Sequence, residues 1–235
     1  MDQVAVDVAL PGQIEPDVLA VPVAEDGAAA FPNGARVLDE RLNGRLRALV
    51  ESGEASGEVG RTLLLHTDGD LRARRVATAG IGRVAEIDAD ILRTAAAAVV
   101  RATTKVGGTL AWLVDEQLPL SAEEQARAVI EGVALASYAP DRWKTKPEDR
   151  RTFERVVVCA EDDPALRAAA ERAARVAGWV NFARDLANAP PNELTPERLA
   201  ARASEIAGEV SHLSAEALGP DGLHELGMGA FAAVA

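Results

Sequence analysis

The chain has 235 residues, of which 48% are hydrophobic and only 3% aromatic. Any core must therefore be built from Ala, Val and Leu, and aromatic rings are too few to form stacking platforms for nucleic-acid bases. The formal net charge of −12 at pH 7 argues against a general nucleic-acid or anionic-membrane surface, because both favour clustered Lys and Arg.

Strands and helices are predicted to alternate along most of the chain. In chain order they are strand 4–10, strand 18–23, helix 34–50, strand 61–66, strand 74–79, helix 88–104, strand 109–114, helix 121–138, strand 155–160 and a long helix from residue 163. A turn-like segment covers 51–60, and a tight turn is expected at 68–70. This alternation predicts an α/β fold whose sheet is largely parallel and covered on both faces.

Local signals mark where several of these helices begin. Asp88 and Asp163 are expected to cap their helices, with Pro164 at the first helical position, where a missing amide costs nothing. Ser121 with Glu124 three residues later forms a capping box. The helix from 163 carries one stripe of small and aliphatic residues that we expect to face the sheet: Leu166, Ala170, Ala173, Ala177 and Val180.

The single cysteine, Cys159, lies in an apolar run over 156–160 and cannot form an internal disulfide. We expect a buried structural thiol rather than a nucleophile. The N-terminus lacks the basic segment and long apolar run of a secretory signal, and no stretch approaches the ~20 apolar residues that a membrane span needs. The expected location is the cytoplasm.

One glycine motif could hold a dinucleotide. Gly80, Gly82 and Ala85 fit G-x-G-x-x-A after a predicted strand, an arrangement in which backbone amides bind a pyrophosphate. The following helix is expected only from Asp88, however, and the acid after the next strand, Asp115, lies farther away than the fingerprint requires. A strand-ending turn is the favoured interpretation.

Neither the histidines nor the acidic clusters predict a metal site. His66, His212 and His224 lack the four-residue spacing that places two imidazoles on one helix face. The acidic groups are Asp68 with Asp70, in a glycine-containing turn, and Glu161, Asp162 and Asp163, at a helix start. The turn and the helix dipole account for both groups without a cation.

A basic loop is the local exception to the acidic charge. Its basic residues lie on both sides of Trp143 in the sequence: Arg142, Lys144, Lys146, Arg150 and Arg151. Glu148 and Asp149 are interleaved with them, which favours a solvated loop between domains over an anion-binding surface.

The segment NFARDLANAPPNELTP, residues 181–196, reads as a helix end, a rigid loop and a new helix start. The first helix is expected to close at Asn188, because Pro190 and Pro191 remove amide donors and disfavour helical geometry before them. Thr195 can cap the next helix, with Pro196 at its first position.

The same segment resembles the signature that joins the two domains of the leucyl (cytosol) aminopeptidase family. The matching positions are Ala183, Arg184, Asp185, Leu186, Asn188, Pro190, Asn192, Leu194, Thr195 and Pro196. Two further stretches resemble the family: EGVALASYAPDRWKTK over 131–146, apart from Pro140, and LGMGAFAAVA over 226–235, which resembles its glycine-methionine-glycine turn entering a strand.

The resemblance implies a domain organisation. It suggests a macro-like N-terminal α/β domain over 1–150, a connecting strand and linker helix over 151–187, and the truncated start of an α/β catalytic domain over 188–235. If residues 229–235 form the expected strand without partners, they are an aggregation hazard.

The resemblance also implies an activity. Enzymes of this family hydrolyse N-terminal, preferably leucine-like, residues from peptides with two divalent metal ions, Mn or Zn, and the complete protein is expected to be a cytoplasmic hexamer. Their metal-ligand motifs lie beyond the glycine-methionine-glycine turn. No catalytic, cofactor-binding or metal residue is therefore assigned within 1–235, and this chain alone is expected to be inactive and to bind no metal.

Besides the aminopeptidase, two alternatives stay open. The chain could be a noncatalytic α/β module that binds a nucleotide-like ligand near Gly80 to Arg83, or that serves oligomerisation. DNA binding is a third possibility, which the acidic charge disfavours.

Overall fold

The structure is a computed structural model that describes residues 4–26, 33–146 and 149–233. The chain divides into two compact units, Met1–Arg184 and Asp185–Ala235, and each is considered by itself. No helix in the described ranges is both long enough and apolar enough to cross a membrane.

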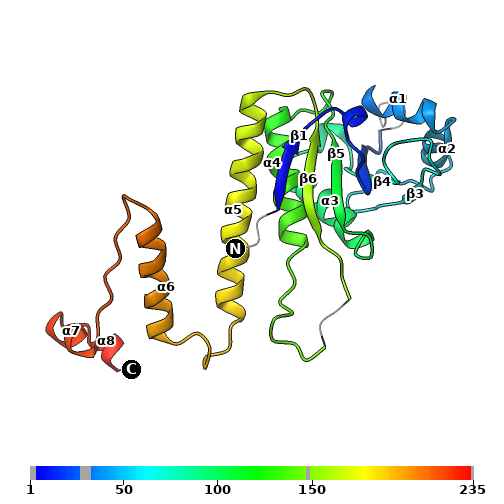
Figure 1. Cartoon of the computed structure of the whole chain (residues 1–235). Helices are drawn as coiled ribbons and strands as arrows, with labels where there is room; N and C mark the ends of the chain where they lie inside the picture. Colours follow the sequence, from blue (N-terminus) through cyan, green and yellow to red (C-terminus); the bar gives the residue numbers. More distant parts are fainter. Residues whose placement is uncertain (1–3, 27–32, 147–148, 234–235) are drawn as a thin grey trace. The chain divides into compact units, whose positions relative to one another are not determined.

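The first unit is built on one six-stranded sheet (Figure 1). Its strands are β1 (Ala5–Val8), β2 (Val18–Val23), β3 (Leu64–His66), β4 (Arg75–Gly80), β5 (Gly108–Leu113) and β6 (Phe153–Cys159). Their spatial order is β1-β6-β5-β2-β4-β3, and every pairing is parallel except that of β3 with β4. The predicted α/β fold with a mostly parallel sheet is confirmed.

Helices cover both faces of this sheet. They are α1 (Asn33–Arg41), α2 (Arg45–Glu51), α3 (Ala89–Ala102), α4 (Ala122–Ala136) and α5 (Pro164–Asn188), with short 3-10 turns at Pro11–Gln13 and Val84–Glu86. Successive strand residues alternate between two buried clusters. Leu110 and Trp112 belong to the cluster with α3, α4 and α5, whereas Ala111 and Leu113 belong to the cluster with α1 and α2.

The sequence predicted one helix over 34–50, and this is wrong. The chain breaks between α1 and α2, where Asn43 and Gly44 have φ of 53° and 76°. Asp39 explains the break, because its Oδ1 accepts hydrogen bonds from the amides of Leu46 and Arg47, both at 3.0 Å. This buried carboxylate satisfies amides of the first turn of α2 that have no partner within the helix.

The predicted helix starts are confirmed at four places. Asp88 accepts from Ile91 N, Ser121 and Glu124 form the reciprocal capping box, Asp163 accepts from Ala165 N and Leu166 N, and Thr195 accepts from Arg198 N. Each cap acts over two or three residues. Such short-range patterns can be read from sequence alone.

The predicted stripe on α5 is buried only in part. Leu166, Ala170, Ala173 and Ala177 are buried, but Val180 is 39% exposed. The 25 residues of α5 span about 37 Å at 1.5 Å per residue. The seven residues of β6 span only about 23 Å at 3.3 Å per residue. The C-terminal part of α5 therefore extends past the sheet it packs on.

The second unit is helical, with α6 (Pro196–Glu209), α7 (Pro220–Glu225) and α8 (Gly229–Ala232). The strand expected after Gly229 is not formed, and residues 234–235 of that segment lie outside the described ranges. A strand needs a neighbour to pair its backbone groups, whereas a helical turn pairs them locally, as Ala233 N does with Gly229 O at 3.0 Å.

Candidate functional site

The glycine turn after β4 is packed against the segment 57–61. Gly80 N donates to Arg61 O at 2.9 Å, and Gly82 N donates to Gly57 O at 2.7 Å. A Cβ on Gly80 would lie 2.0 Å from the carbonyl oxygen of Glu58, so glycine is required there for the close approach of two backbones. Both amides are already used within the protein, and α3 begins only at Ala89. The geometry supports a strand-ending turn and leaves no free amides at these glycines for a pyrophosphate.

The three histidines belong to different segments of the chain. His66 ends β3, His212 follows α6, and His224 lies in α7. Across the described ranges, no group of three or more His, Cys, Asp or Glu side chains is placed to hold a metal ion. The described residues therefore offer no such group for the pair of divalent metals that the family resemblance implies.

The acidic groups have partners within the protein. Asp68 and Asp70 both pair with Arg45, with nitrogen–oxygen distances of 3.6 and 3.7 Å. Of the second group, Asp162 pairs with Arg167 and Asp163 caps α5. These contacts give Asp68, Asp70, Asp162 and Asp163 partners within the protein.

The basic loop joins α4 to β6 within the first unit. The guanidinium of Arg142 lies 4.9 Å from the Trp143 ring centroid. Lys144 pairs with Asp141 at 2.7 Å, and Lys105 of the preceding connection pairs with Asp149 at 2.9 Å. The sequence predicted a loop between domains, whereas the loop lies within one unit. Its local partners support the interpretation as a solvated loop. Glu148 lies outside the described residues.

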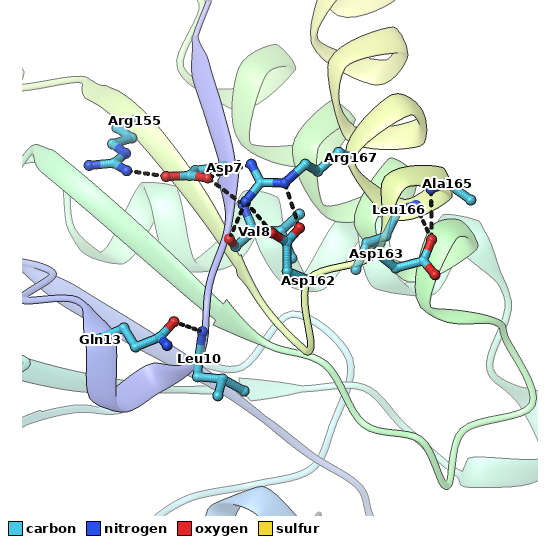
Figure 2. Close-up of polar contacts among 10 residues, drawn as sticks. All are labelled: Asp7, Val8, Leu10, Gln13, Arg155, Asp162, Asp163, Ala165, Leu166 and Arg167. Atoms are coloured by element: carbon cyan, nitrogen blue, oxygen red, sulfur yellow. Dashed lines mark hydrogen bonds and ion pairs between the residues drawn. The ribbon is translucent and has the colours of Figure 1, made fainter.

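A polar cluster joins the edge strand β1 to the start of α5, as Figure 2 shows. Arg167 lies between two carboxylates: its Nη1 donates to Asp7 Oδ1 at 2.9 Å, and its Nε donates to Asp162 Oδ1 at 2.5 Å. Its Nη2 also donates to the carbonyl oxygen of Val8 at 3.0 Å. Arg155 of β6 forms a second ion pair with Asp7. The cluster thus connects the first turn of α5 to the edge strand β1.

These charges shift the pKa of Asp7. Partial burial alone would raise it, but hydrogen bonds from Arg167 and Arg155, together with that from Val8 N, hold the pKa below its usual value of 3.8. Asp7 is therefore ionised at neutral pH, and its carboxylate is paired with both arginines.

Two residues of the 181–196 signature hold α5 against the C-terminal end of α4. Asn181 Nδ2 donates to Ala134 O at 3.0 Å, and Arg184 Nη1 donates to Leu135 O at 3.1 Å. The Arg184 guanidinium also lies 5.5 Å from the Tyr138 ring centroid. Carbonyls in the last turn of a helix have no partner within it, and a cation there is favourable. The signature thus has a structural role that its spacing alone did not reveal.

The rest of the signature forms the predicted joint. Helix α5 ends at Asn188, and the carbonyl of Pro190 accepts hydrogen bonds from Glu193 N at 2.8 Å and Leu194 N at 3.0 Å. Arg198 in the first turn of α6 pairs with Glu193 at 2.8 Å. The expected helix–loop–helix arrangement is confirmed.

The first unit is thus an α/β domain on a mostly parallel sheet, and the joint that follows it carries the family signature. The N-terminal domain model of the cytosol aminopeptidase family matches residues 20–147, and the catalytic domain model of the same family matches residues 181–235. The chain therefore belongs to the cytosol aminopeptidase family, a family of peptide hydrolases. The resemblance drawn from the sequence is confirmed.

Individual relatives agree. The chain is 40% identical over 201 residues to a probable cytosol aminopeptidase of Roseiflexus castenholzii, covering 83% of this chain and 41% of that protein. It is 32% identical over 206 residues to the cytosol aminopeptidase of Pseudomonas aeruginosa, covering 86% of this chain and 42% of that protein. The chain thus spans about four tenths of the length of the curated relatives it matches.

Solved structures show the same fold. A mutant of tomato leucine aminopeptidase superposes with a TM-score of 0.71 at 25% identity, covering 88% of this chain and 42% of that one. The bottromycin maturation enzyme BotP in complex with Mn superposes with a TM-score of 0.60 at 28% identity, covering 83% and 36%. The two family matches and this coverage agree with the expectation of an N-terminal domain followed by the start of a catalytic domain.

Proposed function

We propose that this chain is the N-terminal part of a metal-dependent aminopeptidase that removes leucine-like residues from the N-termini of peptides. The observation that carries the proposal is the order of the two family matches, the N-terminal domain over 20–147 and the catalytic domain over 181–235. The second match begins with the signature segment 181–196. The finer division is 1–150 for the N-terminal domain, 151–187 for the connecting strand and linker helix, and 188–235 for the start of the catalytic domain.

The complete protein would use two divalent metal ions, Mn or Zn, in the cytoplasm, as part of a hexamer. The Mn of the BotP complex and the word cytosol in the relatives' names support the metal class and the compartment. The ligands of these metals would come from catalytic-domain residues outside 1–235. We therefore propose that residues 1–235 alone have no aminopeptidase activity.

The test is an assay of the purified 235-residue chain for release of leucine from an N-terminal leucyl peptide, with Mn²⁺ or Zn²⁺ added. The expected result is no release above a protein-free blank. Metal-dependent release would overturn the inactivity. The enzyme assignment has its own test in the coding DNA beyond codon 235: an open frame with the lysine, aspartate and glutamate motifs supports it, and a stop codon directly after Ala235 would refute it.

A further inference from the structure

A small cavity lies at the carboxyl ends of three neighbouring parallel strands, β5, β2 and β4. Its volume is about 90 Å³, and its walls include Ala24 after β2, Ile81 and Val84 after β4, and Asp115, Gln117 and Leu118 after β5. From β2 the chain proceeds to β3 and β4 on one side, and from β5 it proceeds to β6 on the other. In open α/β sheets, ligands bind at such a reversal of strand order, outside the carboxyl ends of the strands.

Asp115 is the charged side chain in this wall. The residue is only 6% exposed, and its Oδ1 accepts a hydrogen bond from Gln117 N at 3.0 Å. Within the part of the chain that the structure describes, its other oxygen, Oδ2, has no hydrogen-bond or ion-pair partner. Burial raises the pKa of Asp115, as expected for a carboxyl group without a counterion. A ligand with a positive charge would supply the counterion and offset the cost of burying the ionised carboxylate.

The loops that carry the wall are already held in place. Gln125, which is 1% exposed, accepts from Asp115 N at 3.1 Å and donates to Asp115 O at 2.8 Å. On the opposite side, Val84 N donates to Asp26 Oδ2 at 2.8 Å. Because both sides are tied to the fold, little ordering is needed when a ligand enters.

We propose that this cavity binds a small primary amine, whose ammonium group donates to Asp115 Oδ2 while its short alkyl part packs against Ile81, Val84 and Leu118. The volume lies well below the roughly 300–1,000 Å³ of sites for larger ligands, which excludes a whole nucleotide. A metal cation such as Ca²⁺ would need about six or more oxygen ligands, whereas this wall is mostly aliphatic. The proposal is independent of the aminopeptidase assignment and survives if that assignment fails.

The probe is ethylammonium chloride, titrated into the 235-residue chain and followed by the backbone amide signals of Val84, Asp115 and Gln117 in NMR spectra. Saturable shifts centred on these amides are expected, while sodium propionate, an anion of similar size, gives none at the same ionic strength. Asp115→Asn keeps an acceptor for Gln117 N but removes the negative charge, so the affinity should fall roughly tenfold or more. The matched control Glu116→Gln removes an exposed neighbouring charge and should leave the affinity within about twofold.

A second variant guards against a folding defect in Asp115→Asn. Val84→Phe keeps the carboxyl group and fills the cavity from its half-buried rim, so it should also abolish saturation while the remaining NMR signals stay in place. Absence of saturable shifts in the unmodified chain, which is the behaviour of a cavity that holds only water, would overturn the proposal. Equal binding by Asp115→Asn and the unmodified chain would overturn it as well.

Discussion

Arg184 shows how one residue of the signature stabilises the fold. Its guanidinium donates to Leu135 O and contacts Tyr138, so Arg184→Ala leaves a carbonyl at the end of α4 without its partner. We expect the free energy of unfolding, measured in urea, to fall by about 1–2 kcal/mol. Arg184→Lys should recover only part of this loss, because an ammonium cannot reproduce the planar stacking.

The control for Arg184→Ala is Arg172→Ala, an exposed arginine of the same helix. Its stability should change by less than about 0.5 kcal/mol. Equal losses in the two variants would mean that the contacts of Arg184 with α4 and Tyr138 do not matter for stability.

Asp7 makes the stability of the first unit depend on pH in the acidic range. Its pKa is lower in the folded chain than the ordinary value of 3.8, since the hydrogen bonds from Arg167 and Arg155 outweigh its burial. A carboxyl with a depressed pKa stabilises the fold above its unfolded pKa, and this contribution is lost as the pH falls through the folded pKa. Asp7→Asn should therefore reduce stability at pH 7 and flatten the loss of stability below pH 4. Parallel pH profiles for the two proteins, measured by urea unfolding, would contradict this expectation.

Cys159 should be inert in the folded chain. It is 3% exposed, and burial raises the pKa of its thiol to about 12, so both access and thiolate are lacking at pH 8. A colourimetric disulfide reagent should react with it only after denaturation, at a rate set by unfolding. Immediate stoichiometric reaction under native conditions would show that the face of the sheet covered by α1 and α2, where Cys159 lies, opens readily.

At the scale of elements, the contact between α3 and α4 depends on Gly132. A Cβ at this position would lie 2.4 Å from Arg93 O and 3.0 Å from the Ala96 Cβ. Alanine favours a helix over glycine by about 1 kcal/mol, but the overpacking should outweigh this and lower stability by about 1–3 kcal/mol. Thermal unfolding followed by circular dichroism measures the change.

Gly208 of α6 is the matched control, because nothing lies within 4 Å of a Cβ built there. Gly208→Ala should leave the melting temperature of the first unit unchanged and slightly increase the helical signal. If Gly132→Ala behaved in the same way, the two helices would have to separate at little cost.

Elements were predictable from sequence where the determining contacts are local. The capping box of Ser121 and Glu124 and the alternating strands needed only neighbouring residues. The break between α1 and α2 was missed because it depends on the buried Asp39 reaching the amides of Leu46 and Arg47. The strand expected near the C-terminus does not form because a distant contact is missing. Strand pairing requires a neighbouring strand, which the described part of the second unit does not provide.

The candidate sites were less predictable than the elements, because they are made by distant segments. In the sequence, Asp115 is only an acid too far from Gly80 to complete a dinucleotide fingerprint. Its burial follows from the meeting of loops after β2, β4 and β5. Likewise, the Asp7 and Arg167 pair links positions 160 residues apart. For Asp115, the available signal in the sequence was a carboxylate directly after a predicted strand. No pattern in the sequence indicated the Asp7–Arg167 pair.

At the scale of the whole molecule, the two units differ in how they are stabilised. The buried clusters belong to the first unit, whereas no described side chain of 185–235 is buried. Leu199, Leu226 and Phe231 are 47%, 63% and 62% exposed. A helix of 14 residues such as α6 is marginal in water without packing, since isolated helices need about 12–15 residues or more.

This difference predicts a sharp contrast in amide hydrogen exchange. In the 235-residue chain, amides of β2, β5 and β6 should exchange only through global unfolding, while those of α6 and α7 should exchange at rates close to an unfolded chain. In a longer protein that includes the remaining length found in the relatives, α6 should become protected, because the apolar positions now exposed would be covered. Strong protection of α6 in the 235-residue chain itself would contradict this account, since it would mean that the second unit is stable without further partners.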